Sequence, residues 1–157
     1  MGGGASCPVP DKKLQDACKA GDLDVAKAAL SEGADMDGKN GGVPPLIMAA
    51  WWGQDEIVRW LLSLEDIDME VTHKICKGGN ACHAACGRNY ASTLEILIKG
   101  GVSRYEDDDN GLNVYQVLGK YAKGPQKDES KAKEVREYYT NSRGDGRVTS
   151  IKEKIEH

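Results

Sequence analysis

The segment Gly42-Val43-Pro44-Pro45-Leu46-Ile47-Met48-Ala49-Ala50-Trp51-Trp52-Gly53 decides how this chain folds. A proline-containing turn precedes a short apolar run with two adjacent alanines, and a glycine closes the run. The block 46–53 recurs at 14–21, at 82–89 and, more weakly, at 115–122. Successive blocks start 32, 36 and 33 residues apart. A period in this range indicates stacked supersecondary units that bury a shared core.

A second amphipathic stretch follows each of the first three blocks, at residues 23–30, 56–62 and 93–98. Apolar residues recur there at three- and four-residue steps, which predicts a second helix in each unit. These stretches end at a glycine or an acidic turn, as in Gly33-Ala34-Asp35 and Gly100-Gly101. Glycine suits the left-handed position that follows a helix. The sequence therefore predicts pairs of short helices joined by turns.

This pattern resembles the ankyrin repeat, which reads Gly-x-Thr-Pro-Leu-His-x-Ala-Ala-x-x-Gly before a helix ending Leu-Leu-x-x-Gly-Ala-Asp. The matching segments are 33–36, 42–50, 78–85 and 110–115. The Thr-Pro turn is replaced in every copy, and Gly124-Pro125 interrupts the fourth. The resemblance implies an all-α, ankyrin-like repeat solenoid of stacked helix-turn-helix units with hairpin-like loops.

Three regions are expected along the chain. Residues 1–10 form a flexible leader, residues 11–140 the repeat domain, and residues 141–157 a mobile tail. The repeat boundaries fall at about 11–37, 38–70, 71–104 and 105–140. The end units of a stack need polar outer faces. Charged helices at 11–30 and 130–139 fit that need, and Ser130 is the expected N-cap of the second.

Cysteine spacing raises the question of a zinc site at Cys76, Cys82, His83 and Cys86. The spacing lacks a Cys-x2-Cys pair, and no second ligand pair follows it. The resemblance instead implies that Cys18, Cys82 and Cys86 occupy buried small-residue positions. It gives His83 hydrogen bonds between adjacent turns and leaves Cys76 on an exposed loop. We therefore expect free thiols, no metal and no cofactor.

The resemblance also implies a concave binding face. That face combines the hairpin tips with the two residues before each repeat glycine, which are the exposed positions of the first helices. These pairs are Lys19-Ala20, Trp51-Trp52, Gly87-Arg88 and Lys120-Tyr121. Tryptophan, tyrosine and arginine dominate binding hot spots. We predict that Trp51, Trp52, Arg88 and Tyr121 form one partner-binding strip; packing of one tryptophan beneath the loop 71–79 is the alternative.

The loop Asp107-Asp108-Asp109 is the most acidic of the expected tips. Asp107 and Asp108 are further candidates for contact with a basic partner. A solvated turn is the alternative, and calcium is not expected because no spacing for six ligands follows.

The chain begins Met1-Gly2-Gly3-Gly4-Ala5-Ser6-Cys7, which fits the Met-Gly-x-x-x-Ser signature of N-myristoylation. One acyl chain binds membranes only marginally, so a second anchor is required. Cys7 is a suitable palmitoylation site. We expect acylation of Gly2 and Cys7 and a cytoplasmic location at a membrane, with the inner face of the plasma membrane as a candidate. A plain flexible glycine-rich start is the alternative.

Composition narrows the function. The formal net charge is −4, from 21 Lys and Arg against 25 Asp and Glu, which argues against nucleic-acid binding. The sequence shows no Ser/His/Asp set, no phosphate loop and no paired carboxylates in a plausible cleft, so we predict that it is not an enzyme. We expect a monomeric, membrane-tethered adaptor that binds a still unidentified protein. The alternative is a soluble ankyrin-like inhibitor or regulatory subunit that docks an enzyme through its concave face.

Overall fold

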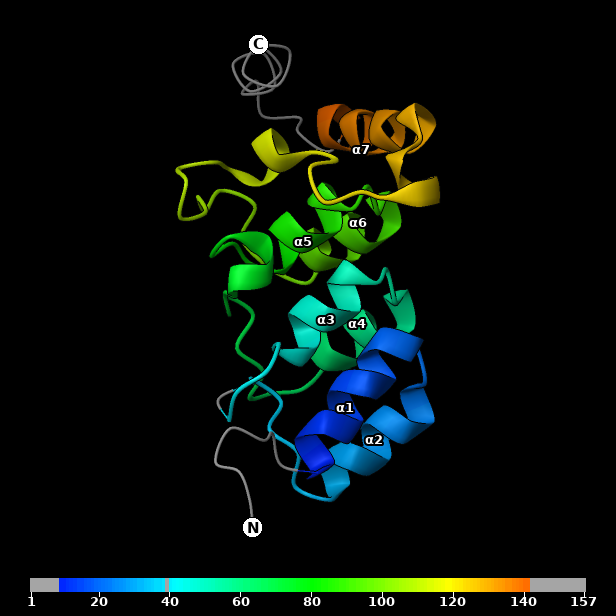
Figure 1. Ribbon diagram of the computed structural model, residues 1–157, viewed down its shortest axis with the longest axis vertical. Helices are drawn as coiled ribbons and strands as arrows, with labels where there is room; N and C mark the ends of the chain where they lie inside the picture. Colours follow the sequence, from blue (N-terminus) through cyan, green and yellow to red (C-terminus); the bar gives the residue numbers. More distant parts are fainter. Residues whose placement is uncertain (1–8, 39, 142–157) are drawn as a thin grey trace.

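The computed structural model describes residues 9–38 and 40–141, which form a stack of short helices (Figure 1). The predicted all-α repeat fold is confirmed. The helices are α1 (Val9–Ala20), α2 (Leu23–Ser31), α3 (Pro45–Trp51), α4 (Asp55–Leu62), η1 (Lys74–Cys76), α5 (Ala81–Gly87), α6 (Ala91–Lys99), η2 (Val114–Val117), η3 (Gly124–Lys127) and α7 (Glu129–Asn141). In these residues, extended pairing is limited to the isolated bridges His73–Gly79 and Asp107–Asn113.

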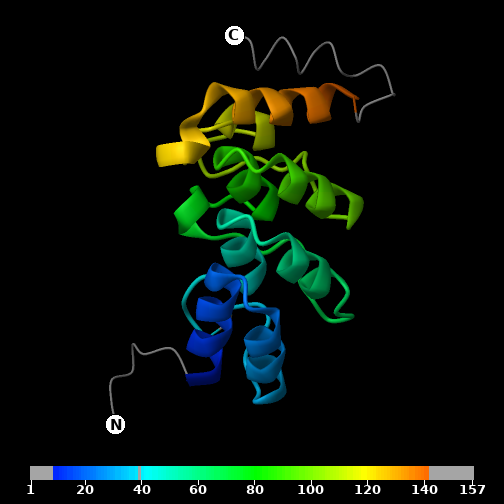
Figure 2. The same ribbon diagram turned by 90° about the vertical axis from the view of Figure 1, so that its right-hand side faces the viewer.

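Three helix pairs build the stack, and α7 covers α6 at its C-terminal end (Figure 2). The inner helices α1, α3 and α5 contact one another in sequence, and α2, α4 and α6 lie beside them as the outer helices. The alanine pairs Ala49-Ala50 and Ala84-Ala85 are fully buried, so neighbouring units approach closely. Leu61 and Leu97, on the outer helices, are also fully buried and fill the layers between units.

The turn between the two helices of each unit requires a left-handed residue. Gly21 and Gly53 supply it with φ of +83° and +67°. Asn89 occupies the same position in the third unit with φ of +63°. Asparagine tolerates this conformation better than most residues, so the repeat register continues without a glycine.

The fourth unit departs from the pattern. Its first helix is shortened to the 3₁₀ helix η2, and the chain then turns at Gly119, where φ is +70°. The amides of Gly119 and Tyr121 donate to the carbonyls of Cys86 and Gly87, at 3.2 and 2.9 Å. The segment 118–122 thus supplies a donor to the Gly87 carbonyl at the end of α5 and a further donor to the Cys86 carbonyl, which also accepts from the Asn89 amide at 3.1 Å.

Two predicted helix ends need correction. Helix α1 begins at Val9, inside the predicted leader, and Pro10 fits its first turn because amides there need no helical acceptor. Ser130 is not the N-cap of α7. Asp128 performs that role, because its Oδ1 accepts hydrogen bonds from the amide and the hydroxyl of Ser130, at 2.9 and 2.7 Å.

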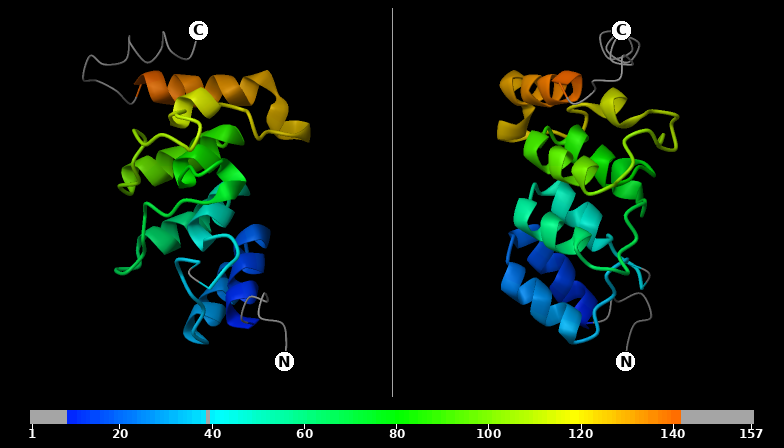
Figure 3. Two further views of the ribbon diagram at one scale, coloured as in Figure 1. Left: turned by 60° about the vertical axis from the view of Figure 1, so that its left-hand side comes forward. Right: turned by 180° about the vertical axis from the view of Figure 1, so that it is seen from behind.

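The loops between units project from one edge of the stack (Figure 3) and are joined by acidic side chains. Asp37 accepts from the amide of Asp68 at 2.9 Å, and Glu70 accepts from the amide of Ser103 at 2.8 Å. Within loops, Asp35 and Asp68 accept from the amides two residues on. Several loop carboxylates therefore hold successive loops in register.

Candidate protein-binding surface

Five side chains from four successive units gather at the C-terminal ends of the inner helices. We call them the aromatic–cation strip: Lys19, Trp51, Trp52, Arg88 and Tyr121. The Lys19 Nζ lies 4.9 Å from the Trp52 ring centre. The Arg88 Cζ lies 5.1 Å from the Trp51 ring and 5.3 Å from the Trp52 ring. The Trp51 and Tyr121 ring centres are 5.2 Å apart. The four residues predicted from the sequence thus lie together, and Lys19 joins them.

The strip is only partly exposed. Trp52 is 37% exposed, whereas Trp51 and Tyr121 are half-buried and Arg88 is only 7% exposed. The prediction that Gly87 and Arg88 are exposed is wrong. The segment 118–122 crosses the end of α5, and a Cβ atom placed on Gly87 would lie 2.1 Å from the Tyr121 ring. Trp52 is therefore the aromatic side chain that the strip offers most openly to a partner.

Arg88 has an unusual environment for a charged group. Its Nη1 donates to the Tyr121 carbonyl at 3.3 Å, and its Nε is buried without an acceptor. Within the described part of the chain its guanidinium forms no ion pair. Stacking on two indole rings offsets part of the cost of burying this charge. Burial also raises the pKa of Tyr121 to about 12, so its phenol is neutral at physiological pH.

Lys19 belongs to one of the pairs predicted to be exposed, Lys19-Ala20, but it is not among the residues predicted to bind a partner. The repeat register could have identified it, because Lys19 occupies the position in its unit that Trp51 occupies in the next unit. Its cationic head lies over Trp52, which only the stacking of α1 against α3 reveals.

The two candidate residues of the acidic loop 107–109 differ in solvent exposure. Asp107 is exposed, whereas Asp108 is only 6% exposed. The Asp108 Oδ1 accepts from the amides of Asn110 and Leu112, each at 2.9 Å. Asp108 therefore shapes the turn and offers little surface, while Asp107 remains accessible.

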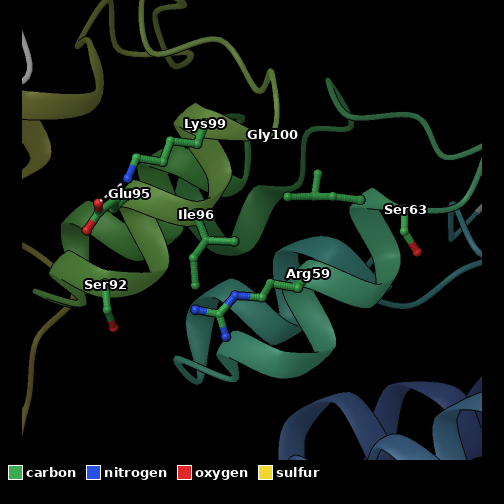
Figure 4. Close-up of a pocket in the computed structure, with 8 residues that line it drawn as sticks. Arg59, Ser63, Ser92, Glu95, Ile96, Lys99 and Gly100 are labelled. Atoms are coloured by element: carbon green, nitrogen blue, oxygen red, sulfur yellow. Dashed lines mark hydrogen bonds and ion pairs between the residues drawn. The ribbon is translucent and has the colours of Figure 1, made fainter.

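An open groove of about 530 Å³ lies between the outer helices α4 and α6 (Figure 4). Leu62 and Ile96 contribute its apolar part, and Arg59 extends into the space between the helices. Glu95 and Lys99 form an ion pair of 2.6 Å at its edge. The groove lies on outer helices, so it is separate from the strip on the inner ones.

The cysteine predictions are confirmed for Cys18, Cys82 and Cys86, which are all buried, and wrong for Cys76. The turn η1 directs the Cys76 thiol inward, where it donates to the Gly79 carbonyl at 3.2 Å. Burial raises the pKa of the Cys18 and Cys76 thiols to about 12 and shifts those of Cys82 and Cys86 in the same direction. These thiols are therefore protonated and poorly reactive.

His83 links adjacent turns as predicted, with 3.0 Å between its Nε2 and the Leu112 carbonyl. Its Nδ1 lies 3.2 Å from the amide of Asn80, which completes a capping box at the start of α5. Within residues 9–38 and 40–141, no group of three or more His, Cys, Asp and Glu side chains is placed to hold a metal ion.

Gly2 and Cys7, the predicted acylation sites, lie outside the described residues. In the part that is described, no helix is both long and apolar enough to cross a membrane.

Comparison with known proteins agrees with this architecture. Residues 10–73 match the family model described as "Ankyrin repeats (3 copies)", which supports the ankyrin repeat family for this part of the chain. The chain is also similar to two proteins of Latrodectus tredecimguttatus. It is 28% identical to alpha-latrocrustotoxin-Lt1a over 101 residues and 27% identical to alpha-latroinsectotoxin-Lt1a over 104 residues.

These matches cover 64% and 66% of this chain but only 7% of each toxin. The similarity is therefore restricted to a short portion of either relative. Ankyrin repeats mediate binding of protein partners, so the matched region indicates a protein–protein interaction module.

Proposed function

We propose that this protein is a non-catalytic adaptor that binds a partner protein through the aromatic–cation strip on its inner-helix face. The observation that carries the proposal is the solvent exposure of the Trp52 ring. Its large ring is 37% exposed and has two cations near it, with Lys19 Nζ at 4.9 Å and Arg88 Cζ at 5.3 Å from the ring centre. The adjacent Trp51 packs against Tyr121. Binding energy in protein interfaces concentrates in such residues, near the centre of a contact.

The backbone under the strip supports this role. Trp52 is the C-cap residue of α3, and its amide donates to the Met48 carbonyl at 3.1 Å. The neighbouring Trp51 ring packs against Tyr121, with planes tilted by 31°, so a contact inside the protein holds the ring next to Trp52. A surface that is ordered in advance loses less entropy on binding.

The test compares Trp52→Ala with Trp60→Ala, which makes the same change on outer helix α4. Both full-length variants are used to capture partners from the cells that produce the protein, and capture is quantified by mass spectrometry. Loss of an aromatic hot spot costs about 2 kcal/mol or more, which is about thirtyfold in affinity. Trp52→Ala should lose partners that Trp60→Ala retains. Equal capture by the two variants contradicts the proposed surface.

The proposal includes a membrane tether through acylation of Gly2 and Cys7. The Met-Gly-x-x-x-Ser signature supports it, and Cys7 supplies the second site that stable anchoring requires. Gly2→Ala should release the protein from membranes into the cytosol, whereas Cys7→Ser should leave weak, reversible attachment. An unchanged membrane fraction for Gly2→Ala contradicts the tether.

A soluble inhibitor or regulatory subunit is the second candidate, because the same strip serves either role. Separation of the cell extract into membrane and cytosolic fractions distinguishes the tethered adaptor from the soluble subunit. Trp52-dependent capture together with a fully soluble wild-type protein favours the soluble candidate.

A further inference from the structure

The aromatic–cation strip carries a charge pattern that differs from the rest of the molecule. Its five side chains include two cations, Lys19 and Arg88, and no acid. The whole chain has a formal net charge of −4. The acidic loops lead into the N-terminal ends of the inner helices, and the strip lies at the opposite, C-terminal ends.

The cations of the strip have no counter-charge inside the described part of the protein. Lys19 is exposed, and its Nζ lies over the Trp52 ring and forms no ion pair within the described residues. Arg88 is nine-tenths buried, forms no ion pair and keeps an unpaired Nε. A charge buried without a carboxylate partner projects its field onto the nearby surface, because protein screens charge less than water does.

From this arrangement, and resting on the proposed function, we propose that the strip binds an acidic peptide segment of its partner protein. An apolar side chain of the segment covers the exposed part of Trp52. Carboxylates on either side of it face Lys19 and the positive field of Arg88. Complementary charge of this kind steers association and excludes basic partners.

A purely structural role for these cations gives a different result. A cation near the C-terminus of a helix stabilises the helix by interacting with its dipole, and Lys19 and Arg88 both lie near such ends. If that were their only role, replacing Lys19 would alter the free energy of unfolding and leave peptide binding unchanged. Binding and stability are therefore measured on the same variants.

The experiment selects binders for the full-length protein from a displayed library of random 12-residue peptides. We expect an excess of Asp and Glu in the selected peptides, which are then synthesised. In Lys19→Glu, affinity for such a peptide should fall about tenfold or more. It should be unchanged in Lys27→Glu, which makes the same charge change on an exposed lysine of α2. Replacing the peptide's Asp and Glu by Asn and Gln should weaken binding similarly.

The outcomes separate this inference from the proposed function. Neutral or basic peptides whose binding still requires Trp52 overturn the acidic preference and leave the binding surface intact. If no selected peptide depends on Trp52, both the inference and the proposed surface fail. A single-stranded oligonucleotide or an anionic vesicle that binds more tightly, with the same dependence on Lys19, makes phosphate the ligand and also overturns the inference.

Discussion

Gly87→Ala tests whether Tyr121 closes the end of α5 as the structure has it. Gly87 is buried in the last turn of α5. Its added Cβ would lie 2.1, 2.6 and 3.0 Å from Tyr121 Cδ2, Cε2 and Cγ. Two contacts oppose movement of the ring, because the Tyr121 amide donates to the Gly87 carbonyl and the ring packs against Trp51.

Two effects of opposite sign decide the result. Replacing a helical glycine by alanine stabilises a helix by about 0.7 kcal/mol, because alanine loses less backbone entropy. Overpacking of a buried contact costs about 2 kcal/mol. Gly87→Ala should therefore lower the free energy of unfolding by about 1 kcal/mol.

The assay is urea denaturation of the full chain, followed by circular dichroism at 222 nm. The control repeats the substitution in a Tyr121→Ala background, where the clash is absent. There Gly87→Ala should stabilise the protein by about 0.7 kcal/mol, giving a coupling energy of about 2 kcal/mol. Stabilisation by Gly87→Ala in the presence of Tyr121 would refute the packing of Tyr121 on α5.

Three further predictions concern stability. Burial lowers the pKa of His83 below 6.5, so the unfolded state binds the proton at a higher pH than the folded state does. The free energy of unfolding should therefore fall as the pH drops below about 6.5. In denaturation measured from pH 5 to 8, His83→Gln should reduce this dependence on pH. Asp37→Ala removes the acceptor for the Asp68 amide and should cost about 1 kcal/mol in urea denaturation, with no change contradicting the loop contact. Trp51→Ala should lower the free energy of unfolding by about 2 kcal/mol because the ring is half-buried, whereas Trp52→Ala should lower it by less than about 1 kcal/mol. Equal losses of stability in thermal denaturation would contradict the different burial of the two rings.

The sequence by itself determined the repeating architecture. Helix pairs, their turns and the buried positions of Cys82 and Cys86 depend on contacts between residues a few positions apart or on the repeat register. Glycine conformation and helical periodicity act locally, so a single sequence contains these signals. The ends of the outer helices differ from the predicted limits by only one or two residues.

The predictions failed where a distant segment controls exposure. Arg88 occupies an exposed position by register, but Tyr121, 33 residues later, covers it. Cys76 was placed on an exposed loop, but the turn at η1 directs its thiol to backbone carbonyls. Neither contact leaves a periodic trace in the sequence.

Only the tertiary structure decided that the predicted strip is a mixed surface, with Arg88 inside and Trp52 outside. The fourth unit is the physical reason. Its shortened first helix ends before Gly119, which frees the segment 118–122 to cross α5. The repeat pattern specifies which residues lie near one another, but the path of this irregular segment decides which of them water and a partner can reach.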